Sequence, residues 1–218
     1  MLLAIDTATD FAGLALYDRN CVWDEEVWFA ARNHTVTLMP RLNTMLASVR
    51  CDIADLEAIV VSLGPGSYTG VRIAVSVAKG LALPHGLPVV GIPTLDVTAY
   101  PHRTQSRPVI AVAQAGRKRL LAAPYLQQDE GWAQIHPPAI YTIEELVASL
   151  SDPVLMTGEL RAEDIAYIEQ REPTNIDLLL PFDRVRRPSI LAHLGKLKLD
   201  NSDNHTLDQL EPIYLNEP

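Results

Sequence analysis

The amino-acid sequence predicts an α/β protein of two successive lobes, each a mixed β-sheet with flanking helices. Short apolar runs alternate with helical periodicities along the chain, which is typical of α/β proteins. A strand pattern restarts at residue 108, after a helical stretch. Between the two halves lies the polar, proline-flanked segment PHRTQSRP at 101–108. We therefore expect lobes at 1–103 and 104–218.

The first half should open with a three-stranded meander. Three apolar runs follow one another at hairpin spacing, at 2–6, 12–18 and 21–30. A helix should follow over 35–49, because apolar residues recur there on one helical face. These residues are Leu38, Leu42, Met45, Leu46 and Val49. The later elements expected in this lobe are a strand near 58–63, a helix over about 70–83, a strand over 87–92 and a helix from Thr94 toward Tyr100.

The second half should repeat the scheme of strands followed by helices. Strand-like runs occupy 108–115, 120–127 and 153–158, and the segment 131–140 continues the first two. Helices are expected over 142–150, over 162–170 and after Pro188. Thr142 and Glu145 form a capping box at the start of the first of these helices. A last apolar piece, LEPIYLN, lies at 210–216.

Composition and charge restrict the classes of function. The chain has 218 residues, 48% hydrophobic and 21% charged, an ordinary globular balance. No apolar run approaches the roughly 18 residues of a membrane helix, and the apolar start meets Asp6 at once. We therefore expect a first strand rather than a signal peptide, and a cytoplasmic protein in which Cys21 and Cys51 are free thiols.

The net charge of −9 disfavours tight binding of nucleic acid by this chain alone. Two small basic clusters lie at 117–119 and 184–187, and we expect both to be solvated loops. If the protein serves a nucleic-acid pathway, a partner should hold the nucleic acid.

The most patterned stretch, SLGPGSYTGVRI, links the strand near 58–63 to the next helix. Its loop consists of Gly64, Pro65, Gly66, Ser67, Tyr68, Thr69 and Gly70. The common phosphate-binding loops are not matched, because neither GxxxxGK[ST] nor GxGxxG is present. Two interpretations stay open. The loop turns the chain and starts a helix capped by Ser67 or Thr69, or it also binds an anion at that helix N-terminus.

The helix expected over 70–83 is apolar on nearly all sides. One stripe carries mostly small residues, namely Val71, Ala74, Val75, Ala78 and Ala82. A second stripe carries Ile73, Val77, Gly80 and Leu81. Such a helix must be covered on both sides. The core of its own lobe covers one side. The other is either covered by the same lobe or open to a second helix, which small side chains allow to approach closely.

Patterns for catalysis and metal binding are weak. The segment IDTATD at 5–10 resembles the first phosphate loop of actin-like ATPases, but Ala8 stands where that loop usually has a glycine. No HExxH or GxSxG motif occurs, and no two histidines lie three or four residues apart. The histidines are His34, His85, His102, His136, His193 and His205. We therefore expect no catalytic residue, no metal and no cofactor in this chain.

The stretch GPGSYTGVRI, with KGLAL behind it, resembles the signature of the TsaB (YeaZ) family of bacterial threonylcarbamoyladenosine tRNA-modification proteins. LLAIDTATD, RNHTVTLMPRLNTML, VVGIPTLD and LEPIYLN match other segments of that family in order. Thr35 stands in the place of a serine, and Asn216 in the place of an arginine. The match is good over 1–100 and loose beyond. In the second half, Gln114–Arg117 replaces the usual Asp-Ala-Arg-Arg.

The resemblance implies a two-lobed ASKHA (actin/hexokinase-like) fold and a non-catalytic role beside a TsaD-type subunit, which transfers a threonylcarbamoyl group to adenosine 37 of tRNA. It also implies a TsaE-type ATPase as partner. From the net charge we expect contact with tRNA only through the complex, and from a self-complementary apolar patch on the helices we expect a homodimer when the chain is alone. Leu38 stands where the TsaD-type metal pair would need a second histidine after His34. The alternatives are an ATP-dependent ASKHA-type enzyme acting on its own and, less favoured, a metallopeptidase.

In the resembled family the helices equivalent to 35–49 and 70–83 bundle with the partner. The residues expected at this interface are Leu38, Met39, Leu42, Met45, Leu46, Val71, Ala74, Val75, Ala78 and Ala82. On this interpretation, the glycine-rich loop at 64–70 starts a docking helix.

Overall fold

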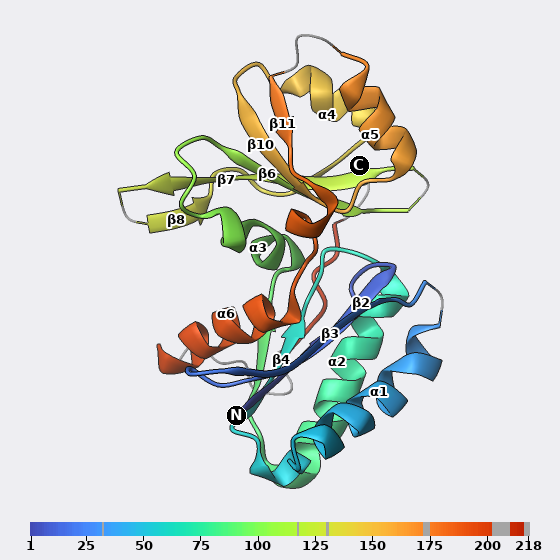
Figure 1. Ribbon diagram of the computed structural model, residues 1–218, viewed down its shortest axis with the longest axis vertical. Helices are drawn as coiled ribbons and strands as arrows, with labels where there is room; N and C mark the ends of the chain where they lie inside the picture. Colours follow the sequence, from blue (N-terminus) through green and yellow to red (C-terminus); the bar gives the residue numbers. More distant parts are fainter. Residues whose placement is uncertain (32, 117, 130, 172–174, 202–209, 216–218) are drawn as a thin grey trace. The chain divides into compact units, whose positions relative to one another are not determined.

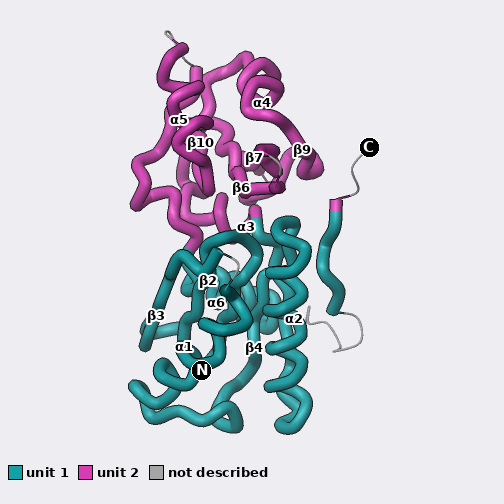
Figure 2. Tube along the Cα trace, turned by 90° about the vertical axis from the view of Figure 1, so that its right-hand side faces the viewer, with its two compact units in different colours: residues 1–94, 187–214 teal, residues 95–186, 215–218 magenta. Residues whose placement is uncertain are grey.

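The computed structural model describes residues 1–218 except 32, 117, 130, 172–174, 202–209 and 216–218 (Figure 1). The chain forms two compact units (Figure 2). Unit 1 comprises residues 1–94 and 187–214, and unit 2 comprises 95–186 and 215–218. Among the helices of the described residues, none has the length and apolar character needed to cross a membrane.

Unit 1 contains a five-stranded mixed sheet in the order β3-β2-β1-β4-β5. Its strands are β1 (Leu2–Asp6), β2 (Phe11–Tyr17), β3 (Val22–Phe29), β4 (Ala58–Ser62) and β5 (Val89–Ile92). The first three strands pair antiparallel, and β1, β4 and β5 pair parallel. Every residue of β1 and β4 is buried, so helices must cover both faces of the sheet.

The two faces of this sheet carry different helices, as Figure 1 shows. On one face, α1 (His34–Ser48) and α2 (Tyr68–Ala82) pack on the side chains of Leu3, Ile5 and Ile59. On the other face lies α6 (Pro188–Asp200). A Cβ atom built at Gly195 of α6 would lie closer than 3.0 Å to the Val60 side chain. The glycine therefore lets α6 approach the sheet more closely than any larger residue would.

Unit 2 repeats the strand order of unit 1. Its six-stranded sheet has the order β11-β10-β6-β7-β8, and β9 pairs with β7. The pairings β6–β7 and β7–β8 are antiparallel, and β6–β10 and β10–β11 are parallel. The strands are β6 (Val109–Gln114), β7 (Leu120–Gln128), β8 (Gly131–Gln134), β9 (Ala139–Tyr141), β10 (Val154–Gly158) and β11 (Ile176–Leu178).

The helices of unit 2 are short. α4 (Ile143–Ser149) and α5 (Ala162–Glu169) cover one face of its sheet, which includes Ile110, Val154 and Met156. On the other face lies α3 (Thr94–Ala99), of which residues 95–99 belong to unit 2. Four 3₁₀ turns among the described residues complete the elements, at Ile53–Asp55, Leu83–His85, Tyr100–His102 and Pro181–Asp183.

The predicted fold class is confirmed, since both units are mixed sheets with flanking helices. The capping box is present as well, because the Thr142 amide donates to Glu145 and the Glu145 amide donates to the Thr142 hydroxyl. The expected lobes at 1–103 and 104–218 differ from the observed units. The difference arises because α3 packs in unit 2 and α6 packs in unit 1, so each unit takes a helix from beyond the expected boundary.

Candidate functional site

The glycine-rich loop lies directly against the turn that joins β1 to β2. A Cβ atom at Gly66 would lie closer than 3.0 Å to the Ala8 carbonyl, and one at Gly70 would do the same to the Thr7 carbonyl. Two hydrogen bonds join the segments: the Ser67 amide donates to Ala8 O at 2.6 Å, and Thr7 Oγ1 donates to Gly70 O at 2.6 Å. These glycines therefore serve a close contact between two backbones.

The same loop starts α2 with a side-chain cap. Ser67 has extended backbone angles, and its hydroxyl accepts a hydrogen bond from the Gly70 amide at 3.2 Å. Gly64 has a φ of +88°, a conformation that favours glycine. Two loop amides, those of Ser67 and Gly70, thus already bind protein oxygens. The arrangement favours the first interpretation of the loop, as a turn that starts a helix.

The β1–β2 turn is buried and bonded to itself. Asp6, Thr7 and Thr9 are almost inaccessible to solvent. The Asp6 carboxylate accepts a hydrogen bond from the Ala8 amide at 2.9 Å. The Asp6 carboxylate and the Ala8 amide therefore stabilise the conformation of the turn itself.

A hydrogen bond from His34 connects the start of α1 to this turn. The His34 imidazole is buried, and Nε2 lies 2.8 Å from the Thr9 carbonyl, so Nε2 is the donor. Leu38, one helical turn later, is buried in the core of unit 1. Among the described residues, no three His, Cys, Asp or Glu side chains are grouped as a metal site would require. His205 lies outside the described residues.

The interface residues expected from the sequence must be corrected. Nine of the ten are buried in the core of unit 1 and cannot meet a partner, while Met39 is partly exposed. The physical reason is that both helices turn these apolar stripes toward the sheet of unit 1, where the side chains pack on Leu3, Ile5 and Ile59. The buried nine are Leu38, Leu42, Met45, Leu46, Val71, Ala74, Val75, Ala78 and Ala82.

The opposite sides of the same helices carry exposed apolar groups. Val36 of α1 is 70% exposed and Tyr68 of α2 is 56% exposed, and Leu83, in the turn directly after α2, is 70% exposed. Met39, Ile73, Val77 and Leu81 are partly exposed. We call these seven residues the outer face of α1 and α2. The sequence did show its second stripe, at Ile73, Val77 and Leu81, but the periodicity does not tell which of two apolar stripes meets the sheet.

A groove of about 420 Å³ runs along this outer face. Thr35 lies on its α1 side, and Tyr68, Arg72, Ile73 and Val77 are among its α2 residues. The Arg72 guanidinium lies over the Tyr68 ring, 4.5 Å from its centroid. The groove thus combines apolar walls with one cation, a composition common at the centre of protein interfaces.

The C-terminal segment 210–214 supports the start of α2, beside which it runs in Figure 2. Leu210 is buried in the core, and the Ile213 amide donates to the Leu63 carbonyl at 2.7 Å. The Tyr214 ring lies 5.0 Å from the Tyr68 ring, centroid to centroid. The segment thereby helps to fix Tyr68 at one end of the groove. Asn216, which replaces an arginine of the resembled family, lies outside the described residues.

The basic cluster at 184–187 is not simply solvated. Arg186 is buried and donates to Glu159 at 2.9 Å within unit 2. Arg187 pairs with Glu25 in unit 1. In the diverged segment 114–117, Nε2 of Gln114 donates to the Glu159 carbonyl at 3.0 Å, and Arg117 lies outside the described residues. Arg186, Arg187 and Gln114 therefore have structural contacts of their own.

Comparisons with known proteins agree with the resemblance seen in the sequence. The family model for TsaD, tRNA N6-adenosine threonylcarbamoyltransferase, matches residues 28–178. The tRNA threonylcarbamoyladenosine biosynthesis protein TsaB of Bacillus subtilis is 32% identical, over 98% of this chain and 93% of that protein. TsaB of Escherichia coli is 33% identical over 60% of this chain and 57% of that protein. YeaZ from Pseudomonas aeruginosa has a similar fold, with a TM-score of 0.78 at 24% identity, over 98% of this chain and 99% of that one.

Proposed function

The chain belongs to the TsaB (YeaZ) family of tRNA threonylcarbamoyladenosine biosynthesis proteins, within the wider family of the TsaD model, and from this premise we propose that it is a non-catalytic subunit that docks a TsaD-type catalytic subunit. The outer face of α1 and α2 is the docking surface. The observation that carries the proposal is the exposure of Val36 on α1, of Tyr68 on α2 and of Leu83 directly after α2. Exposed apolar side chains along two neighbouring helices, beside a groove lined by Tyr68, Ile73 and Val77, are typical of an interaction site.

The geometry suits a helix-on-helix interface. Each helix has fifteen residues and is therefore about 22 Å long, enough for the partner's two helices to pack along both. A related subunit with the same two helices fits this surface. Without that subunit, the same face pairs with its own copy, because a self-complementary patch gives a two-fold homodimer.

The β1–β2 turn supports a non-catalytic role. In an ATP-dependent enzyme of this fold, the turn and the glycine-rich loop would leave their amides free for phosphate. Here the Ala8, Ser67 and Gly70 amides are bonded to protein oxygens. His34 has Leu38 in the position of a second metal ligand, and that leucine is buried. The chemistry then belongs to the TsaD-type subunit.

The charge of the chain supports an indirect role toward tRNA. With a net charge of −9, it repels phosphate on average, so tRNA binds to the complex rather than to this chain alone. We propose a TsaE-type ATPase as a further partner, which membership of the family supports. The cytoplasm is the compartment in which such a complex modifies tRNA.

Isothermal titration calorimetry separates this proposal from its main alternative. The full chain is titrated with a TsaD-type subunit and, separately, with ATP·Mg²⁺. We expect saturable heat with the subunit and none with the nucleotide. Saturable nucleotide binding to the lone chain, together with ATP turnover that Asp6→Ala abolishes, would establish the ATP-dependent enzyme instead.

A further inference from the structure

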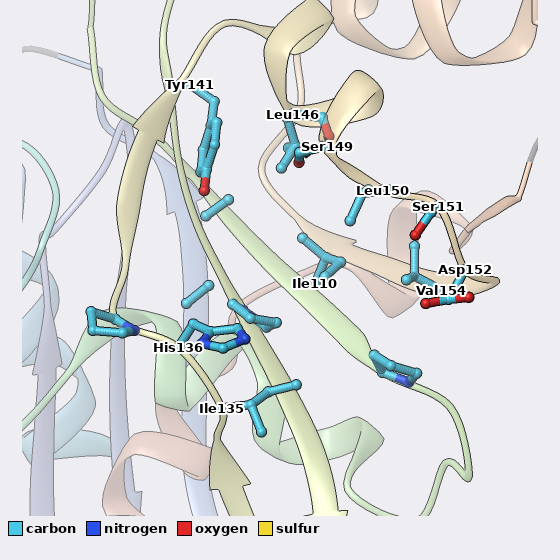
Figure 3. Close-up of a pocket in the computed structure, with 15 residues that line it drawn as sticks. Ile110, Ile135, His136, Tyr141, Leu146, Ser149, Leu150, Ser151, Asp152 and Val154 are labelled. Atoms are coloured by element: carbon cyan, nitrogen blue, oxygen red, sulfur yellow. Dashed lines mark hydrogen bonds between the residues drawn. The ribbon is translucent and has the colours of Figure 1, made fainter.

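Unit 2 contains a cavity of about 370 Å³ that plays no part in the proposed docking (Figure 3). It lies between α4 and the sheet formed by β6, β7 and β9. Aliphatic side chains make up most of its wall, among them Ile110, Leu146, Leu150 and Val154. Its volume falls within the range of about 300–1,000 Å³ that is usual for small-molecule sites.

The cavity exists because α4 is short. The helix has seven residues and ends at Ser149, after which Leu150 adopts an extended conformation. In unit 1 the corresponding helix, α1, has fifteen residues and contributes His34, Leu38, Leu42, Met45 and Leu46 to the interior. The missing turns of α4 leave part of the face of β6 and β7 open. The cavity thus results from the short length of α4.

Polar side chains stand at two sides of the opening. Figure 3 shows Tyr141 of β9 and His136 of the β8–β9 loop on one side, and Ser151 and Asp152 of the segment after α4 on the other. No hydrogen bond or ion pair joins any of these four side chains to another described residue. They are therefore available to a ligand.

With histidine neutral, the charge at the opening has one sign. The lining residues include no lysine or arginine, and Asp152 is the only acid among them. An apolar body in the cavity would remove apolar surface from water, and an ammonium group at the rim would meet the Asp152 carboxylate. An anionic group at the same rim would be repelled by the Asp152 carboxylate, so it would not increase the affinity.

We propose that this cavity is a binding site for small amphipathic amines, with the apolar body between α4 and the sheet and the ammonium group at Asp152. Tyr141 and His136 can bond a second polar group at the far end of such a ligand. The site does not depend on the docking function, since its residues all lie in unit 2 and the docking surface lies in unit 1.

The test is an NMR titration of the full ¹⁵N-labelled chain with 3-phenylpropylamine and with 3-phenylpropionate. The two probes share one apolar body and differ in the sign of their charge. We expect amide shifts at 109–110, at 122–123 and at the non-proline residues of 136–154, with the amine about fivefold tighter, as one partly exposed ion pair gives. Asp152→Asn should remove this preference. Glu144→Gln, which removes an exposed charge elsewhere on α4, should leave it intact.

A substitution at the opening of the cavity tests whether the apolar part of the ligand lies between α4 and the sheet. Ser149→Phe, at an exposed position on the opening, should weaken both probes at least about fivefold while the fold persists. Absence of shifts at the cavity residues with either probe would overturn the site. Equal affinity for the two probes, or a preference that survives Asp152→Asn, would overturn the assignment to amines.

Discussion

Units 1 and 2 have the same strand order but differ in the helices that cover it. In unit 1, α1 and α2 have fifteen residues each; in unit 2, α4 has seven and α5 has eight. The longer helices carry a buried stripe and a second, exposed apolar stripe. The shorter helices leave a cavity beside the sheet. One topology thus carries the proposed docking surface where helices are long and the proposed small-molecule site where they are short.

The largest effect should come from charging the buried stripe of α2. Ala78 has no accessible surface, and Ala78→Glu would bury a carboxylate without a partner. We expect a loss of about 4 kcal/mol in the free energy of unfolding, enough to unfold unit 1 or nearly so. Circular dichroism during thermal unfolding checks this. A variant with wild-type stability would show that the stripe does not face the core.

The second-largest loss of stability should follow from adding a methyl group where the glycine-rich loop contacts the β1–β2 turn. Gly70→Ala would place a Cβ against the Thr7 carbonyl, and we expect it to cost about 3 kcal/mol. Gly80→Ala is the matched control in the same helix. A Cβ there meets no atom within 4 Å, so it should stabilise the helix by about 0.5–1 kcal/mol. Chemical denaturation measures both. Equal stabilities of the two variants would contradict the close contact.

The smallest effect concerns pH and unit 2. Burial lowers the pKa of His102 from its ordinary value of 6.5, and its Nε2 lies 3.2 Å from the Thr157 hydroxyl. Since the folded protein holds the His102 proton less tightly than the unfolded chain, its contribution to stability is present above pH 6.5 and is lost as pH falls below that value. His102→Gln should flatten this part of the stability–pH curve. An unchanged curve in the variant would assign the dependence to other groups.

The sequence predicted the fold class because apolar periods reveal strands and helices locally. It did not reveal which unit α3 and α6 join, because that depends on long-range packing such as Gly195 against Val60. The glycines of the loop predicted a turn, but not their contact with Thr7 and Ala8, about sixty residues away in the chain. In α2 the helical period located two apolar stripes, but it could not tell which of them packs on the sheet, and the expected interface residues were on the stripe that does.

The central claim is that α2 faces the core with one stripe and a partner with the other, and neighbouring residues allow a direct test. Val77 is partly exposed on the outer face, whereas Ala78 is fully buried. Val77→Glu should leave the fold intact but place an unpaired carboxylate in the interface, which weakens association by at least about 2 kcal/mol. Gln128→Glu, at an exposed position of β7, adds the same charge in unit 2 and should change nothing.

The deciding measurement is analytical ultracentrifugation of Val77→Glu, Gln128→Glu and the wild type, each alone and with a TsaD-type subunit. We predict that the wild type and Gln128→Glu form the homodimer alone and the heterologous complex with the partner. Val77→Glu should sediment as a folded monomer in both experiments. A folded Val77→Glu that associates as tightly as the wild type would place the docking surface elsewhere on the molecule.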